Sequence, residues 1–263
     1  MTKIYKGLLF LIIKFVLRKT FFVAKSIFQD ARFRCFVGDV VGRHLFKYGV
    51  HEEENSRFLL DNLKLKKFEI GLDIGANLGW YTVLISKNSH EQATLYAFEP
   101  DSDNFSLLQH NIKLNECSNV QTFKQAVSNK SENLNLYKYP KKNCGKHSLL
   151  PQKDCQEVEV AAITLNDFFK DKNLEKIRFI KIDIEGYELT ALKGASSLLA
   201  HCPMIMMEFS PNLFQNEGES SELLDFMKSY SYTPKVLRDG CLVEVDMEIL
   251  KISKEQIDLF WTK

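Results

Sequence analysis

The residues of this chain best suited to chemistry are carboxylates that end short apolar segments next to glycines. The first is Asp73, in the segment E-I-G-L-D-I-G-A-N-L-G-W-Y that covers residues 69–81. Gly75 can adopt a positive φ without steric cost, and Gly79 allows the following helix to pack close to the sheet. The segment therefore predicts a strand, a tight turn and a helix that together cradle a nucleotide-like ligand.

The residues of this turn also limit which ligand it would hold. A dinucleotide-binding turn has a glycine where this chain has Asn77, so that the backbone can approach a pyrophosphate. Asp73 at the strand end would repel a phosphate and attract an ammonium or sulfonium group. S-adenosylmethionine carries both cationic groups, so the turn favours it as the ligand.

A second carboxylate, Glu99, ends the apolar segment T-L-Y-A-F-E-P-D, 26 residues after Asp73. The second strand of a doubly wound sheet ends beside the first turn, where an acidic residue can accept both ribose hydroxyls of an adenosine. The alternative is an exposed glutamate that pairs with a lysine, but the preceding turn favours the binding role. Gln125 and Ala126 end the third strand, where they would leave room for a purine and hydrogen-bond its edge. An ordinary buried strand end is the alternative for each of these two.

The segment R-F-I-K-I-D-I-E-G-Y-E, residues 178–188, places three carboxylates within six residues. Asp183 would stand at the carboxyl end of a central strand, where open α/β sheets bind their ligands, and would serve the cofactor amino group or a substrate hydroxyl. Glu185 is the alternative acid or base. For Glu188 we favour a first-turn residue that complements the helix dipole.

Strand and helix patterns alternate along most of the chain, which is typical of a mostly parallel, doubly wound α/β sheet. Strands are expected at residues 69–73, 94–99, 120–127, 178–183 and 204–209, a hairpin-like pair at 132–139 and 156–162, and final strands at 232–238 and 241–246. Helices are expected at residues 52–66, 78–88, 102–115, 165–169, 187–200 and 219–230. The Asp239-Gly240 turn favours a hairpin, and hence an antiparallel C-terminal edge.

The N-terminus differs in charge from the rest. The formal net charge is +1, but residues 1–29 hold six basic residues and no acidic one, which leaves about −5 on the remainder. In a helix, Lys3, Lys14, Arg18 and Lys25 would form one stripe. We divide the chain into a basic amphipathic helix with a strand-and-turn entry, residues 1–50, and a catalytic domain, residues 51–263.

This helix would lie on an anionic bilayer or pack on its own domain or a partner, and the pattern leaves both open. A membrane span is not expected, because Lys14, Arg18 and Lys19 interrupt the apolar run. No small-residue cleavage site follows the run, and the six cysteines show no zinc-binding or disulfide spacing. We expect a cytoplasmic protein with possible peripheral contact at the inner membrane face.

The motifs L-D-I-G-A-N-L-G-W-Y-T, A-F-E-P-D and K-I-D-I-E-G-Y-E, in this order, closely resemble the FkbM-type S-adenosylmethionine-dependent methyltransferases. The resemblance covers about residues 48–210. It implies a class I (Rossmann-like) methyltransferase fold and methyl transfer to an oxygen, frequently a sugar or polyketide-type hydroxyl. The positions that match the family's cofactor site are Asp73, Gly75, Asn77, Gly79, Glu99 and Asp183. The family's Leu-Asp element reads Leu165-Asn166-Asp167 here.

An alcohol is a poor nucleophile, so a general base would assist the transfer. The candidates are Asp183, Glu185, Glu208 in M-I-M-M-E-F-S-P-N, and His147, whose imidazole titrates near neutral pH. A solvated loop histidine is the alternative for His147, and a strand-end contact with backbone for Glu208. A magnesium site built from Asp183, Glu208 and Asn212 is possible but not favoured.

We therefore predict an S-adenosylmethionine-dependent O-methyltransferase that acts on a hydroxyl of a saccharide, glycolipid or related metabolite. A nucleic-acid methyltransferase is the nearest enzymatic rival, but the catalytic region is net acidic and lacks an N/D-P-P-Y/F-type motif. A non-catalytic or membrane-scaffolding protein that retains the fold is the rival of a different class.

Overall fold

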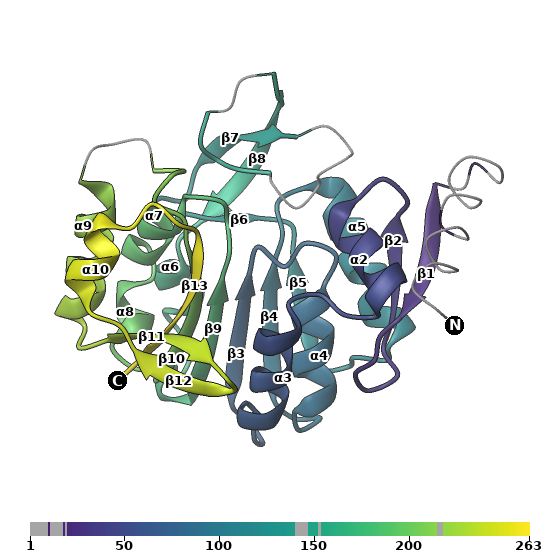
Figure 1. Ribbon diagram of the computed structural model, residues 1–263, viewed down its shortest axis with the longest axis horizontal. Coiled ribbons are helices and arrows are strands. Elements are labelled where there is room, and N and C mark those ends of the chain that lie inside the picture. Colours follow the sequence, from purple (N-terminus) through teal and green to yellow (C-terminus); the bar gives the residue numbers. More distant parts are fainter. Residues whose placement is uncertain (1–9, 11–17, 19, 140–146, 152–153, 215–217) are drawn as a thin grey trace.

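The computed structural model describes residues 10, 18, 20–139, 147–151, 154–214 and 218–263 (Figure 1). Among them, the largest sheet has eight strands. Their order is β12 (Cys241–Glu244), β11 (Thr233–Arg238), β13 (Ile257–Thr262), β10 (Met204–Phe209), β9 (Ile177–Ile182), β3 (Ile70–Ile74), β4 (Thr94–Phe98) and β5 (Val120–Phe123). The strands from β10 to β5 are parallel, whereas β13 is antiparallel to both of its neighbours.

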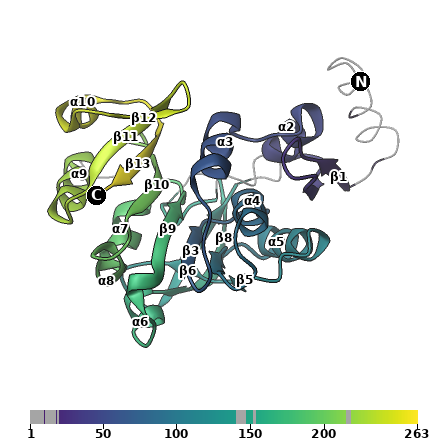
Figure 2. The ribbon, with the colours of Figure 1, turned by 90° about the horizontal axis from the view of Figure 1, so that it is seen from below.

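Helices cover both faces of this sheet, as a doubly wound fold requires (Figure 2). One side carries α3 (Glu53–Asn62), α4 (Trp80–Asn88) and α5 (Ser102–Leu114), and the other carries α6 (Leu165–Phe169), α7 (Glu188–Lys193), α8 (Ser196–Leu199) and α9 (Glu219–Ser229). Successive side chains of a strand point to opposite faces of the sheet. Met206 of β10 therefore packs into the core on the side of α3 and α4, whereas Ile205 and Met207 pack into the core on the side of α7 and α8. The central strands are therefore mostly apolar, with Asp73 of β3 and Lys181 of β9 as buried charged exceptions.

A small sheet lies beyond the carboxyl ends of the parallel strands (Figure 1). It contains β6 (Ala126–Val127), β8 (Gln156–Ile163) and β7 (Asn133–Lys138), in that order. The antiparallel pairing of β7 and β8 confirms the expected hairpin-like pair. The expected strand at 120–127 is in fact two strands, and its end, β6, belongs to this second sheet rather than to the first.

The N-terminal region differs from the prediction. Residues 21–25 form β1 (Phe21–Lys25), which pairs antiparallel with β2 (Arg32–Phe36), so Lys25 belongs to a strand and not to a helical stripe. The remaining basic positions of the stripe lie outside the described residues, except Arg18. The expected strand-and-turn entry also contains a helix, α2 (Val40–Tyr48). Phe10 is buried and its ring packs against Phe22 and Phe46.

Two further differences concern the second half of the chain. The expected helix at 187–200 is broken into α7 and α8 at Gly194, where a Cβ would lie 2.0 Å from the Ser128 carbonyl oxygen. The expected C-terminal hairpin is present as β11 and β12, but α10 (Met247–Ile252) and β13 were not predicted. Strand β13 inserts between β10 and β11, so it supplies most of the antiparallel edge. In the described part of the chain, no helix is long and apolar enough to cross a membrane.

Candidate active site

A cavity opens where β3, β4 and β9 end, beneath the small sheet. Seven of the predicted site residues line it, namely Gly75, Asn77, Glu99, Gln125, Ala126, His147 and Asp183. Apolar side chains that include Phe98, Val127 and Leu136 complete the wall. Asn104 lies in the first turn of α5 and also lines the cavity. A cavity lined by apolar side chains and a few polar groups suits a nucleoside.

Glu99 is fixed at the end of β4 by backbone groups. Its Oε2 accepts the Asn77 N–H at 2.8 Å, and its Oε1 accepts the Asp101 N–H at 2.9 Å. The side chain is buried, and burial raises the pKa of Glu99 to about 7. Because a carboxylate oxygen has two lone pairs, each oxygen keeps acceptor capacity for a ligand hydroxyl.

The turn between β3 and α4 is held against the neighbouring strands. Gly75 has φ +77°, and a Cβ there would lie only 1.9 Å from the carbonyl oxygen of Asp183. The Gly75 and Ala76 N–H groups both donate to the Phe98 carbonyl oxygen at 3.0 Å. At Gly79 an added Cβ would lie 2.8 Å from Leu108 of α5, so the close neighbour is a helix rather than the sheet. Gly79 therefore sets the packing of two helices.

Asp73 lies beneath the cavity instead of in its wall. Its Oδ2 accepts the Thr82 hydroxyl at 2.5 Å, and its Oδ1 is 3.9 Å from Lys181 Nζ. Burial, the largest influence, raises the pKa of Asp73. The sequence predicts Asp73 beside the ligand, whereas its side chain is almost completely covered. Any action of Asp73 on a ligand would therefore come from the charges of Asp73 and Lys181 and from the shape of the turn after β3.

Lys181 is the site residue that sequence reasoning missed. It lies on β9, is 5% exposed, and donates to Asp183 Oδ2 at 3.1 Å and to the Gly75 carbonyl oxygen at 3.3 Å. The carboxylates of Asp183 and Asp73 raise the pKa of Lys181 against the opposing effect of burial. The available signal was a lysine within the apolar run R-F-I-K-I-D, where a strand buried on both faces rarely carries a charge without a partner.

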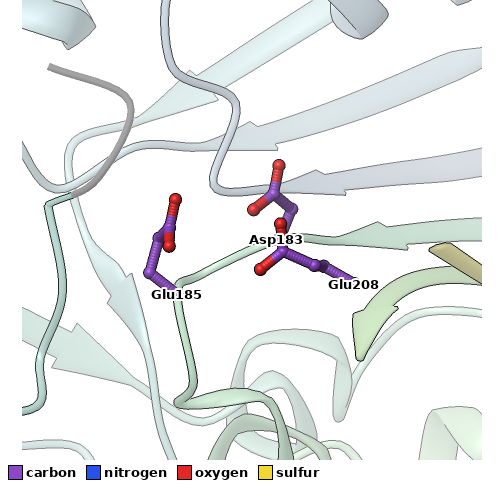
Figure 3. A group of neighbouring side chains, drawn as sticks. All are labelled: Asp183, Glu185 and Glu208. Atoms are coloured by element: carbon purple, nitrogen blue, oxygen red, sulfur yellow. The ribbon is translucent and has the colours of Figure 1, made fainter. Parts of the chain in front are cut away.

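Three carboxylates gather next to the Asp183 end of the cavity (Figure 3). One oxygen from each of Asp183, Glu185 and Glu208 lies within 4.8 Å of the others. Burial and then the charges of Asp183 and Glu185 raise the pKa of Glu208. Its Oε1 accepts the Ser210 hydroxyl at 2.6 Å, and its Oε2 accepts from Gln256. Asp183 and Glu208, two of the three residues expected to form an oxygen cluster, are therefore close together, and Glu185 lies with them.

His147 approaches the cavity from the side of the small sheet. Its Nδ1 accepts the Tyr139 N–H at 3.1 Å, which leaves the proton of the neutral ring on Nε2. Burial lowers the pKa of His147, so the neutral ring is favoured at neutral pH. His147 and Glu99 line the same cavity, whereas Glu208 does not line it.

These features define the class of protein. A doubly wound sheet with an antiparallel strand inserted near one edge, and a cavity at the carboxyl ends of its parallel strands, is a class I methyltransferase fold. The chain belongs to the family described as the methyltransferase FkbM domain, whose model matches residues 73–234. This match confirms the resemblance of the three motifs.

Two curated relatives are similar over different lengths. "Methyltransferase 1" of Beauveria bassiana is 29% identical over an alignment of 143 residues, and the match covers 47% of this chain and 57% of that protein. The chain therefore spans a little over half the length of this relative. The "Hexuronic acid methyltransferase AglP" of Haloferax volcanii is 23% identical over 188 residues, 72% of this chain and 74% of that protein. Among solved structures, an S-adenosylmethionine-dependent O-methyltransferase of Thermotoga maritima has a TM-score of 0.46 at 10% identity, covering 92% of this chain and 77% of that one.

Proposed function

We propose that this protein transfers the methyl group of S-adenosylmethionine to a hydroxyl of a saccharide, glycolipid or related metabolite. The observation that supports this most strongly is that Glu99 and Asp183 line one cavity from two different strand ends. A carboxylate at the first position suits a ribose diol, and one at the second suits a cationic methionine end. Gln125 and Ala126 would then flank the purine.

The residues of the site have distinct roles in this proposal. S-adenosylmethionine supplies a methyl group on a positively charged sulfur. The acceptor oxygen forms a bond to this carbon while the carbon–sulfur bond breaks and its electron pair stays on sulfur. Asp183, which faces the cavity and is oriented by Lys181, takes the hydroxyl proton. One oxygen each of Glu208 and Glu185 lies within 4.8 Å of an Asp183 oxygen, a separation at which one bridging water would relay that proton.

Metal assistance is the less favoured form of this chemistry. The Asp183, Glu185 and Glu208 oxygens are close enough to one another to surround one ion. However, Asp183 already pairs with Lys181, and both oxygens of Glu208 accept hydrogen bonds from neighbouring side chains. We therefore propose a base without a metal.

The acceptor class rests on the family and on one relative. The Haloferax volcanii protein is named for a hexuronic acid, which is a saccharide, and it matches nearly three quarters of this chain. We also propose the division into residues 1–50 and 51–263, with peripheral contact of the basic N-terminal segment at the inner membrane face. Residues 32–34 join the two parts, because the Arg32 and Arg34 N–H groups donate to Asn115 and Asn111 at the end of α5.

A methyl-transfer screen tests the proposal. S-adenosylmethionine with a radioactive methyl group is incubated with the full-length protein and panels of oligosaccharides, glycolipids, lipid-linked sugars and RNA. We expect label on a saccharide-containing acceptor, with Asp183→Asn as the inactive reference. Label on RNA alone would contradict the acceptor class. The absence of transfer to every panel, together with absence of donor binding, would leave the non-catalytic alternative.

A further inference from the structure

Among the described residues, carboxyl groups outnumber basic groups at the Asp183 end of the cavity. Asp183, Glu185 and Glu208 are neighbours there, and Asp73 lies on the other side of Lys181. Lys181 is the basic residue that pairs with this group in the described part of the chain. Four carboxyl groups thus face one lysine, at a place where each is at least partly buried.

The surrounding elements bring further carboxyl groups close to this cluster. Asp258 of β13 lies opposite Glu208 in the strand register, and its partner is the neutral side chain of Asn55. Glu52 precedes α3 and accepts the Tyr81 hydroxyl at 2.5 Å, with His51 3.1 Å away. Glu188 of α7 is buried and accepts only backbone N–H groups of the Asp183 loop. Elements on several sides of the cavity end therefore present carboxyl groups.

The methyl donor and its product differ by one positive charge. Transfer converts the sulfonium of S-adenosylmethionine into the neutral thioether of S-adenosylhomocysteine, while the adenosine, the ammonium and the carboxylate stay the same. We infer that this site binds the donor more tightly than the product, so that loss of the sulfonium charge helps to release S-adenosylhomocysteine. The inference rests on the proposed function, because it concerns the same cavity.

The size of the effect can be bounded by taking the sulfonium and the nearest carboxylate to be about 4 Å apart. Opposite charges about 4 Å apart attract measurably even where solvent screening is strong. Lys181 and the mutual repulsion of the acids reduce the net field. We expect S-adenosylmethionine to bind at least about tenfold more tightly than S-adenosylhomocysteine, which corresponds to about 1.4 kcal/mol.

Calorimetric titration of the full-length protein tests this directly. The ligands are S-adenosylmethionine, S-adenosylhomocysteine and sinefungin, whose amine-bearing carbon replaces the methylated sulfur and keeps a positive charge. We expect sinefungin to group with the donor, and the product to be weaker. Product affinity equal to or above donor affinity would overturn the inference. Absence of binding by all three ligands would instead overturn the proposed function.

Charge-removing variants show whether the acidic group causes the preference. Glu185→Gln keeps the size of the side chain and removes a carboxylate, and we expect it to lower the ratio of product to donor dissociation constants by at least threefold. Burial and the neighbouring acids raise the pKa of Glu208 to about 9, so Glu208→Gln removes less charge and should lower the ratio less. Glu244→Gln, on the exposed edge strand β12, is the matched control and should leave the ratio unchanged. Thermal melts verify that each variant is folded. An unchanged ratio in both site variants, with folding intact, would contradict the inference.

Discussion

Lys181 connects the two acidic motifs of the site. Asp73 ends β3 and Asp183 follows β9, and the lysine between them contacts both and the Gly75 carbonyl oxygen. A buried charge that loses its partner keeps its desolvation cost. Loss of Lys181 would therefore destabilise the folded protein by more than the net energy of its ion pairs with the two aspartates. Lys181 therefore positions both the turn after β3 and Asp183, the proposed base.

Replacement of this lysine should be strongly destabilising. We expect Lys181→Met to lower the free energy of unfolding by about 3–5 kcal/mol, because it leaves uncompensated carboxylates in the interior. Lys193→Met removes an exposed pair with Glu222 and should cost less than about 1 kcal/mol. Urea unfolding at pH 7 measures both. Similar losses for the two variants would contradict a role for Lys181 as the counter-charge of the site.

Glu188 predicts a pH dependence of stability. Burial raises the pKa of Glu188 from 4.5 to about 7. Between these values the folded state binds more protons than the unfolded state, so stability falls as the pH rises and the loss is complete above pH 7. One oxygen of Glu188 accepts the Ile184 and Gly186 N–H groups, and the other has no hydrogen-bond partner among the described residues.

The variant Glu188→Gln tests whether ionisation of Glu188 lowers the stability as the pH rises. Glu188→Gln keeps the accepting oxygen and cannot ionise, so we expect it to exceed the wild type in stability by about 1–3 kcal/mol at pH 8. The advantage should shrink toward pH 5. Urea midpoints at four pH values between 5 and 8 give the comparison, with Glu244→Gln as the exposed control. An advantage that does not change with pH would refute the explanation.

Individual site residues were predictable to the extent that local sequence determines their place. Glu99 and Asp183 end apolar strands, and the ends of parallel strands meet at one edge, so their convergence follows from the pattern. The pairing of Lys181 with Asp73 does not, because the partners are 108 positions apart and only the register of β3 and β9 brings them together. Burial of Asp73 likewise depends on neighbouring strands.

At the scale of elements, the turn after β3 determines the site. It passes so close to the loop after β9 that only glycine fits at position 75. Strand types, the α3 to α5 helices and the β7–β8 pair were predictable because periodicity and turn residues agree there. Strand β13 was missed because its position between β10 and β11 is a tertiary property, and the break at Gly194 because its cause is the Ser128 backbone.

A pair of glycine variants separates close packing from backbone strain. Gly75 and Gly240 have nearly equal φ angles, +77° and +78°, but only Gly75 has neighbours within 4 Å of an added Cβ. We expect Gly240→Ala to cost about 1 kcal/mol from strain. Gly75→Ala should cost about 3 kcal/mol or more, because the turn must also move away from Asp183. Equal losses in thermal or urea unfolding would show that the approach to Asp183 is unimportant.

At the scale of the molecule, the basic N-terminal segment predicts salt-sensitive membrane contact. Five of its basic residues precede position 20, and each contributes about 1 kcal/mol near an anionic surface. The Phe10 ring already packs against Phe22 and Phe46, so we expect the attraction to be electrostatic rather than by deep insertion. A variant that lacks residues 1–19 retains β1 and serves for comparison.

Flotation with vesicles measures this contact. We expect the full-length protein to float with phosphatidylserine vesicles at low salt, and to stay unbound with phosphatidylcholine vesicles or at 0.5 M salt, where the Debye length is only about 4 Å. The shortened protein should not float. Equal flotation of the two proteins would contradict the proposed peripheral contact.

The central claim is that the cavity beside Glu99 and Asp183 is a methyl-donor site. Calorimetric titration with S-adenosylmethionine, comparing the wild type with Glu99→Ala and the exposed-site control Glu244→Ala, tests it most directly. We expect micromolar-range binding by the wild type and the control, and at least about tenfold weaker binding by Glu99→Ala, equivalent to about 1.4 kcal/mol. Absence of binding by the wild type, or equal binding by a folded Glu99→Ala variant, would contradict the claim.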